Sequence, residues 1–377
     1  MLYFLISIMK LKPSTAYKIR QVALITVLWT ITGMVLELHN AVNYDPASHK
    51  HFIYFIFGKN ALDHLVITAI GPLIGGIVGG SFIVFYQREK LKIKTYKQKL
   101  LIHSGFYIFF VSIFILLVGT IGALNSREKD FWQIFYNDIF SYRVLRLLLD
   151  WYIIVIMTIF LLDVSEKYGS GVLKKLLLGK YHKPGKEERI FMFLDLRSST
   201  TIAEKIGDEV YFRMLRYFYQ LANEVIINNH GEIYQYIGDE IVVSWKKKPG
   251  MGGADCLHCF TAIRDAVKRQ EFFFIQNFGV VPYFKAGIHS GEVTTGEIGS
   301  VKKDIVYSGN VLNTAARIVA LCNQYNESLI ISDTLYEELK ETPGYRFSYL
   351  DTPVLRGKTQ KMGLYSVNPV EKDYEKP

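Results

Sequence analysis

Four long apolar stretches in the first half of the sequence limit most strongly what this chain can fold into. They cover residues 21–39, 65–86, 104–124 and 145–163. Each comes close to the roughly 20 residues that a helix needs to cross the hydrocarbon core of a bilayer. A helix satisfies all its backbone hydrogen bonds internally, as lipid requires. The sequence therefore predicts a membrane domain of four helices over residues 1–165, with the lipid bilayer as a partner.

The basic residues beside these stretches predict how the chain is oriented in the membrane. Lysine and arginine are concentrated in residues 88–99, after the second stretch, and in residues 167–183, after the fourth. The loops at 40–63 and 125–142 carry few charges. Because positively charged loops stay on the cytoplasmic side, we expect a multi-pass protein of the cell inner membrane. Its N-terminus and its second half are then cytoplasmic.

The net charge of +9 raises the question of a nucleic-acid partner. Much of the positive excess lies beside the apolar stretches, where membrane topology and anionic lipid headgroups account for it. We therefore predict that the protein binds no nucleic acid.

The second half of the chain has the pattern of a folded α+β domain. A short linker helix is expected over residues 166–188, and Pro184 with Gly185 interrupts it. Residues 189–368 form the predicted catalytic domain and residues 369–377 a C-terminal tail. The order β-α-β-β-α-β favours a ferredoxin-like core, with helices on one sheet face and the other face left for ligand or partner. The expected elements of this core are a strand at 189–195, a helix at 198–229, a hairpin at 232–245, a helix at 254–277 and paired strands at 283–299.

Two acidic turns and one helix face carry the chemistry of this domain. Asp195 and Asp239 each follow an apolar, strand-like run, so each should project from a strand end or a tight turn. Two carboxylates brought together in this way can hold a pair of divalent cations, which polarise a phosphoryl group and activate an oxygen nucleophile. Asn313 and Arg317 are four residues apart, so they share one helix face and can both reach a triphosphate or ribose.

Together these motifs resemble the catalytic domain of class III nucleotidyl cyclases, which make cyclic AMP or cyclic GMP. The resemblance covers roughly residues 185–367. Phe193-Leu194-Asp195, Gly238-Asp239 and the run from Gly309 to Arg317 fill the family pattern in order and at suitable spacing. The resemblance implies that Asp195 and Asp239 hold two Mg²⁺ or Mn²⁺ ions, with the backbone carbonyl of Leu196 as a further ligand. It also implies that Asn313 orients the ribose and that Arg317 stabilises charge on the transferring phosphate.

The same resemblance assigns residues to the phosphates of the nucleotide. The loop of Arg197, Ser198, Ser199 and Thr200 would offer backbone N–H groups at the start of a helix. Many family members have glycine where this chain has Ser198. Near the C-terminus, Leu355-Arg356-Gly357-Lys358 resembles the closing segment whose lysine meets the terminal phosphates, so Lys358 is the candidate and Arg356 the alternative.

Recognition of the base follows the family pattern less closely. Gln235 stands near the place where adenylate-specific members have a lysine, and Val306 stands where they have Asp or Thr. Asp304 would contribute if the register were shifted. Gln235 can donate and accept hydrogen bonds, so it suits adenine or guanine. We expect ATP as the substrate because most bacterial members with this layout make cyclic AMP, and GTP stays open.

The resemblance also implies a composite active site. In the family one chain supplies the carboxylates and the other the Asn and Arg, so a head-to-tail homodimer would build two equivalent sites. The sequence thus predicts a membrane-bound adenylate cyclase that converts ATP to cyclic AMP and pyrophosphate. The alternatives are a guanylate cyclase and a catalytically inactive, cyclase-like membrane receptor. A cyclic-di-GMP synthase, suggested by Gly238-Asp239-Glu240, would leave Asn313 and Arg317 without a role.

Two groups of metal-binding residue types lie outside this site. Cys256 and Cys259 form one CxxC pair without the further ligands of a zinc site, so a buried helix face is the favoured interpretation. In the cytoplasm these thiols should be reduced. Four histidines gather on or near the predicted outer side of the membrane, where they could bind a metal, sense pH or ligate haem. They are His39, His49, His51 and His64.

Overall fold

The structure, a computed structural model, divides the chain into two compact units. One consists mainly of residues up to Lys167 and the other mainly of Tyr168 onward. The described residues are 11–42, 61–87, 95–125, 142–168, 184–247, 254–300, 304–356 and 360–370.

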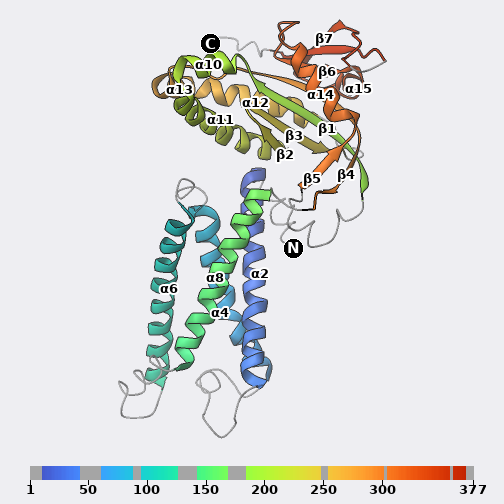
Figure 1. Ribbon diagram of the computed structural model, residues 1–377. Helices are drawn as coiled ribbons and strands as arrows, with labels where there is room; N and C mark the ends of the chain where they lie inside the picture. Colours follow the sequence, from blue (N-terminus) through green and yellow to red (C-terminus); the bar gives the residue numbers. More distant parts are fainter. Residues whose placement is uncertain are drawn as a thin grey trace, which may run out of the picture. The chain divides into compact units, whose positions relative to one another are not determined.

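The first unit is built from long helices (Figure 1). They are α2 (Pro13–Val42), α4 (Ala61–Ser81) with its π-helical continuation η1 (Phe82–Gln87), α6 (Tyr96–Asn125) and α8 (Tyr142–Tyr168). Among the described residues, three segments are long and apolar enough to cross a membrane: Pro13–Leu36, Ala69–Tyr86 and Leu148–Ser165. The predicted stretch at 104–124 lies in α6, which is not one of these three. The part of the chain that the structure describes therefore contains three candidate spans.

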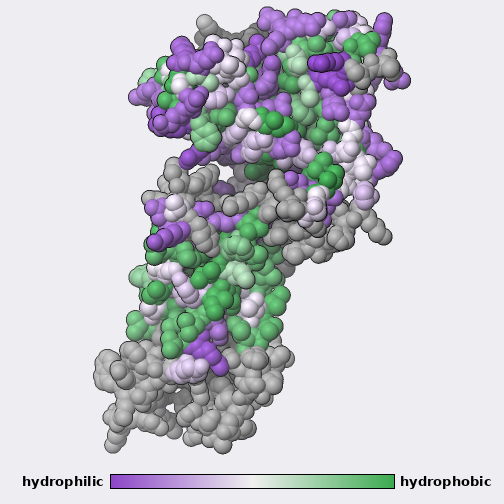
Figure 2. Space-filling model, in the orientation of Figure 1, coloured by the Kyte–Doolittle hydropathy of each residue, from purple (hydrophilic) through white to green (hydrophobic). Residues whose placement is uncertain are grey.

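The outer surface of these helices is apolar. Figure 2 shows hydrophobic residues over much of this unit, and Leu24, Ile31 and Ile153 are each more than half exposed, at 60%, 54% and 62%. Between the helices, the Trp29 indole N–H donates to the Thr158 hydroxyl at 2.9 Å. Apolar residues outside and satisfied polar groups inside are the arrangement that a lipid environment favours.

The second unit is a mixed β-sheet covered by helices. Its strands are β1 (Gly185–Leu196), β2 (Glu232–Ile237), β3 (Glu240–Lys246), β4 (Phe284–Ile298), β5 (Asp304–Ser308), β6 (Leu329–Ser332), β7 (Tyr345–Asp351) and β8 (Leu364–Pro369). Its helices are α10 (Ser199–Ile206), α11 (Asp208–Asn228), α12 (Asp255–Arg269), α13 (Glu271–Phe278), α14 (Asn310–Leu321) and α15 (Asp333–Leu339). Within the described residues the strand order is β2-β3-β1-β4-β6-β8-β7, and β5 pairs with β4.

The first four strands follow the predicted β-α-β-β-α-β connections. They lie in the order β2-β3-β1-β4, and each neighbouring pair is antiparallel. Beyond them, β6 runs parallel to β4 and begins the C-terminal extension. This arrangement places β1 in the middle of the core, with β3 on one side and β4 on the other.

Three predicted elements are divided or joined differently in the structure, and β1 begins at Gly185, ahead of the predicted start at residue 189. The helix expected at 198–229 is interrupted at Gly207, whose φ of 81° ends α10 before α11 begins. The helix expected at 254–277 is interrupted at Gln270, between α12 and α13. The paired strands expected at 283–299 are one continuous strand, β4, which pairs with β1 and β5 instead of folding back on itself.

Both faces of the sheet carry helices, so the expectation of one open face was wrong. On β1, Ile190, Met192 and Leu194 point into the core beneath α11 and α12, whereas Phe191 and Phe193 point to the opposite face. There they pack with buried apolar residues of α14. Because side chains alternate along a strand, Asp195 lies on the same face as Phe191 and Phe193, the face that carries α14.

Candidate active site

Asp195 stands at the end of β1, between a carboxylate and a lysine on the neighbouring strands. The strand register places it opposite Glu240 of β3 and Lys285 of β4. The Lys285 Nζ lies 3.3 Å from the Asp195 Oδ2, and the Lys285 side chain is only 9% exposed. Lys285 therefore holds the Asp195 carboxylate at the strand end and partly neutralises it.

Asp239 lies in the two-residue turn that joins β2 to β3. Gly238, at the first position of this turn, has a φ of 61°, as the first residue of a type II′ hairpin turn does. Since β3 pairs with β1, the turn lies beside the end of β1. The two aspartates are close enough that the Asp239 charge raises the pKa of Asp195. The structure thus brings the two predicted metal ligands together.

The charges around Asp195 and Asp239, at the end of β1, favour binding of a cation. Burial is the main cause of the raised pKa of Asp195, Lys285 lowers it, and Asp239 raises it further. Burial, followed by the charges of Asp195 and Asp239, raises the pKa of Glu240 to about 7. The single positive charge of Lys285 thus has to balance three neighbouring carboxyl groups, those of Asp195, Asp239 and Glu240. A bound divalent cation would relieve this repulsion.

The donor set fits Mg²⁺ or Mn²⁺ better than a softer metal. All the donors are oxygens, which hard cations prefer. Within the described residues, no group of three or more His, Cys, Asp or Glu side chains is arranged to hold a metal ion. A pair of carboxylates with open coordination positions suits ions that keep water and substrate phosphates as their other ligands.

The loop after β1 presents the start of a helix beside these carboxylates. Ser198 has φ 55° and ψ 35°, and its side chain makes no capping hydrogen bond to α10. Its backbone carbonyl accepts a hydrogen bond from the N–H of Ile202 at 2.9 Å, which closes the first turn. The first N–H groups of a helix, including those of Ser199 and Thr200, have no intrahelical partner. They can therefore bind phosphate oxygens.

The Arg197 side chain forms hydrogen bonds with another segment of the chain. Its guanidinium donates to the backbone carbonyl of Glu327 at 2.6 Å and to the Ser328 hydroxyl at 3.3 Å. Its backbone N–H donates to the carbonyl of Tyr283 at 2.9 Å. Arg197 thus fastens the loop to neighbouring segments. Leu196 is buried, with 3% exposed, so only its backbone is available to a ligand.

Helix α14 presents Asn313 and Arg317 on its outer side. Val311, Ala315 and Val319 form its buried face, whereas Asn313 is exposed and Arg317 half-buried. The two polar residues are thus accessible to a ligand or a second chain. They share one helix face, as the sequence predicted.

The base-recognition candidates occupy separate strands, and one phosphate candidate lies outside the described residues. Gln235 is exposed on β2, which pairs with β3. Val306 is half-buried and Asp304 exposed on β5, which pairs with β4. Lys358 lies outside the described residues, and its alternative, Arg356, is exposed.

The histidine cluster falls outside what the structure describes. His49 and His51 are not among the described residues, and the side chains of His39 and His64 are not described. The hypothesis that they bind a metal, sense pH or ligate haem therefore stays a prediction.

Three further residues lie beside Asp195 and Asp239, and the sequence motifs did not identify them. Lys285 was missed, although a lysine inside the apolar run around β4 was a signal for it. Glu240 follows Asp239 directly and could have been included. Tyr219 of α11 donates its hydroxyl to the carbonyl of Gly238 at 2.8 Å. No local pattern points to Tyr219, because it precedes that turn by 19 residues.

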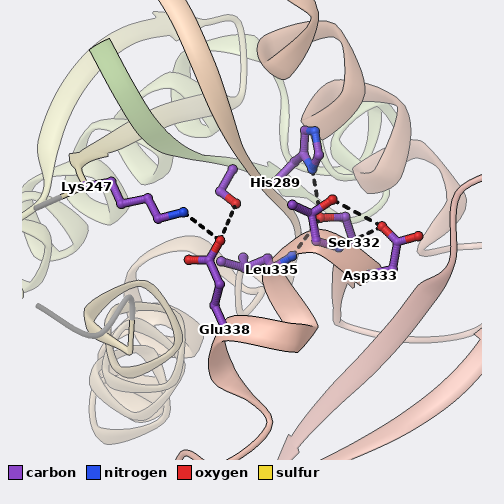
Figure 3. Close-up of polar contacts among 8 residues, drawn as sticks. Lys247, His289, Ser332, Asp333, Leu335 and Glu338 are labelled. Carbon is purple, nitrogen blue, oxygen red and sulfur yellow. Dashed lines mark hydrogen bonds and ion pairs between the residues drawn. The ribbon is translucent and has the colours of Figure 1, made fainter. Parts of the chain in front are cut away.

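A buried Ser–His pair elsewhere in the unit is structural (Figure 3). His289 Nδ1 lies 2.7 Å from the Ser332 hydroxyl, as in a nucleophile–base pair. Ser332 is fully buried, however, and caps α15 by accepting from the Leu335 N–H at 3.4 Å. Glu338 of the same helix accepts from Lys247 at 2.7 Å. These contacts attach α15 to the sheet.

The cysteines are also structural. Cys256 and Cys259 are fully buried on α12, as predicted for a helix face in the core. Cys322 is buried as well, and burial raises its pKa to about 12. Thiols in such surroundings stay protonated and unreactive.

The family of the second unit follows from its sequence together with this geometry. Residues 182–369 match the adenylate and guanylate cyclase catalytic domain. The chain belongs to the class III adenylate and guanylate cyclase family. Asp195 at the end of β1 and Asp239 in the β2–β3 turn both lie within the matched region.

Curated relatives and solved structures agree with this family. The chain is 32% identical over 209 residues to adenylate cyclase 2 of Rhizobium meliloti (strain 1021), an alignment that covers 55% of this chain and 58% of that protein. It is 28% identical over 190 residues to adenylate cyclase 1 of the same strain, covering 48% of this chain and 28% of that one. The chain thus spans less than two thirds of either relative. A bacterial light-regulated adenylyl cyclase shares the fold, with a TM-score of 0.51, 22% identity and coverage of 60% and 67% of the two chains.

Proposed function

We propose that this protein is a membrane-bound adenylate cyclase, which converts ATP to cyclic AMP and pyrophosphate. The convergence of Asp195 and Asp239 at the end of β1, in a domain of the cyclase family, carries the proposal. The presence of both carboxylates, Asn313 and Arg317 argues against an inactive, cyclase-like receptor. The names of the curated relatives favour ATP as the substrate.

Two carboxylates and a backbone carbonyl are the proposed holders of two Mg²⁺ or Mn²⁺ ions. Asp195 and Asp239 would hold the ions through their carboxylates, with the backbone carbonyl of Leu196 as a further ligand. When bound, such ions polarise the α-phosphate and make the ribose 3′ hydroxyl a better nucleophile. Lys285 keeps the Asp195 carboxylate in place through the 3.3 Å ion pair.

The remaining residues would hold the nucleotide along the reaction path. In the reaction the 3′ oxygen bonds to the α-phosphorus and its proton passes to solvent, while the bond between the α-phosphorus and the oxygen that bridges to the β-phosphate breaks and pyrophosphate leaves. Arg317 would neutralise charge that develops on the phosphate, and Asn313 would orient the ribose. The N–H groups of Ser199 and Thr200, together with Lys358, would bind the phosphates.

Arg197 is not expected to bind the phosphates through its side chain, because its guanidinium already binds Glu327 and Ser328. Its proposed role is to hold the loop in the conformation that presents the helix start.

The proposed active unit is a head-to-tail homodimer. Asn313 is exposed on α14, so it can reach a site on a second chain. Large apolar side chains near the ends of β2 and β4 also stand in solvent: Tyr236 is 44%, Ile237 48% and Ile298 60% exposed. Burial of such residues in an interface would be favourable.

The most specific part of the proposal concerns which residues recognise the base of the substrate. Gln235, together with Asp304 or Val306, would contact the base. Because the Gln235 amide offers both a donor and an acceptor, a guanylate cyclase is the alternative function.

The membrane unit is proposed to cross the cell inner membrane four times, with α6 as the span beside the three apolar helices. The N-terminus and the catalytic unit would be cytoplasmic, where ATP and Mg²⁺ are found. The basic residues at 88–99 and 167–183 support this orientation.

Mixing two inactive variants tests the composite site. Asp239→Ala removes a metal ligand, and Arg317→Ala removes the group that neutralises the phosphate. Each variant alone should be inactive. Co-expressed, they should regain about a quarter of wild-type activity, because half of the dimers are mixed and each of these has one intact site. The absence of rescue, with mixed dimers shown to form, would contradict a shared site.

A further inference from the structure

Helix α11 holds the turn that carries Asp239. The Tyr219 hydroxyl donates to the Gly238 carbonyl at 2.8 Å, inside the turn itself. The Tyr219 ring also stacks on Tyr236 of β2, with ring centroids 4.8 Å apart and planes at 26°. Tyr236 in turn donates its hydroxyl to Asn223 at 2.7 Å, one helical turn beyond Tyr219. The turn and its strand are therefore fastened to one face of α11.

The same helix face extends toward the loop after β1. Tyr211 precedes Tyr219 by eight residues, about two helical turns. Burial raises the pKa of Tyr211, and the nearby charges of Asp239 and Asp195 raise it further. The phenol of Tyr211 therefore lies near both proposed metal ligands. Two tyrosines of α11 thus border the carboxylate pair.

The Asp239 turn needs such support to keep its carboxylate in place. It has only two residues, and one of them is Gly238, which restricts backbone rotation least. Catalytic groups must be held to within a fraction of an ångström of the productive geometry, and partners behind a metal ligand commonly provide this. The Tyr219 hydroxyl bonds to the carbonyl directly before Asp239, so it acts on the backbone that aims the carboxylate.

We propose that Tyr219 is a positioning residue of the metal site, which sets the affinity for the divalent cation by fixing the Gly238-Asp239 turn. Tyr219 does so without touching the ion or the nucleotide. The proposal rests on the proposed function, in which Asp239 is a metal ligand. Removing the hydroxyl loses a single hydrogen bond, so the expected weakening of cation binding is about 3- to 10-fold.

Replacing the hydroxyl alone separates positioning from packing. Tyr219→Phe keeps the stacking ring, and Tyr217→Phe on the same helix is the matched control. The Tyr217 ring stacks on Phe273 with centroids 4.4 Å apart, and its hydroxyl faces Gln270 at 3.4 Å, away from the turn. In the full-length protein, Mn²⁺ binding is measured by electron paramagnetic resonance of the free ion, and ATP turnover is titrated with Mn²⁺.

Tyr219→Phe should need about 3- to 10-fold more Mn²⁺ in both titrations, while kcat at saturating Mn²⁺ changes less than about 2-fold. Tyr217→Phe should match the wild type. Amide hydrogen exchange in residues 237–241 should accelerate only in Tyr219→Phe, with β1 unchanged. Mn²⁺ titrations that superimpose for the two variants would overturn the proposal, and so would faster exchange throughout β1, which indicates general destabilisation.

Asp239→Ala distinguishes this inference from the proposed function. If Asp239→Ala loses Mn²⁺ binding and turnover while Tyr219→Phe behaves like the wild type, only the role of Tyr219 fails. If Asp239→Ala retains both, Asp239 is not a metal ligand, and the proposed function fails with the inference.

Discussion

Adding one methyl group beneath α14 should both destabilise the catalytic unit and disable it. Gly287 lies in β4 where α14 crosses the sheet. A Cβ atom at this position would lie 2.3 Å from the backbone nitrogen of Val319 and 2.6 Å from the carbonyl oxygen of Ala315. These are backbone atoms of α14, so no side chain can rotate away to make room. Gly287→Ala must therefore push α14 away from β4.

The size of the effect follows from this geometry. Overpacking a core costs roughly 1–3 kcal/mol, and contacts with fixed backbone place Gly287→Ala at the upper end, about 2–3 kcal/mol. For a domain of this size the midpoint of thermal unfolding should fall by roughly 4–12 °C. Because α14 carries Asn313 and Arg317, a displacement near 1 Å should lower kcat by about 10²-fold.

The assay compares Gly287→Ala with Gly296→Ala in the same strand. At Gly296 the nearest atom to a new Cβ is the Cα of Pro184 at 3.6 Å, an ordinary van der Waals contact. Thermal unfolding and cyclase activity of both full-length variants are measured, the activity below the unfolding range. Gly296→Ala should stay close to the wild type. Equal unfolding midpoints and equal activities for the two variants would refute the close packing of α14 on β4.

Three further predictions concern other parts of the chain. Ser198→Gly should stabilise the catalytic unit by about 0.5–1 kcal/mol, because Ser198 has a left-handed φ of 55° that glycine adopts without strain; a lower denaturant midpoint would contradict this. In metal-free protein the pKa of Glu240 is raised from 4.5 to about 7, so the folded state binds more protons than the unfolded state between these values. Stability should therefore fall as pH rises through this range, and Glu240→Gln should reduce the fall; an unchanged pH profile of the unfolding midpoint would count against it. A chain that begins near residue 184 should lose specific activity on dilution faster than the full-length protein, because tethering in the membrane raises the effective concentration of the partner domain; identical dilution curves would mean that the membrane unit contributes nothing to assembly.

Much of the candidate site could be predicted because its residues lie in short, local motifs. Asp195 follows an apolar run that had to be a buried strand, and Gly238-Asp239 has the form of a hairpin turn. The i, i+4 spacing of Asn313 and Arg317 is enough to place both on one helix face. In each case a few neighbouring residues determine the local backbone.

The parts that were missed depend on contacts between distant segments. Lys285 reaches Asp195 only because β4 pairs with β1, and Arg197 binds the segment at Glu327, 130 residues away. The interpretation of 283–299 as paired strands was wrong, because β4 runs through Ser290 and Gly291 without a turn. In the fold Gly291 remains extended, with its α-carbon facing Val311 of α14. No single window of sequence contains this information.

The most direct test of the central claim is a product assay on the purified full-length protein. ATP and GTP are supplied in parallel with Mn²⁺, and the products are identified by mass spectrometry, with Asp195→Ala as the control. We predict that wild-type protein forms cyclic AMP and pyrophosphate from ATP and that Asp195→Ala retains less than about a tenth of this activity, since a lost metal ligand costs several kcal/mol of barrier. Cyclic GMP as the main product would establish the alternative substrate. No cyclic nucleotide from either substrate, or full activity of Asp195→Ala, would contradict two-metal cyclase catalysis at this site.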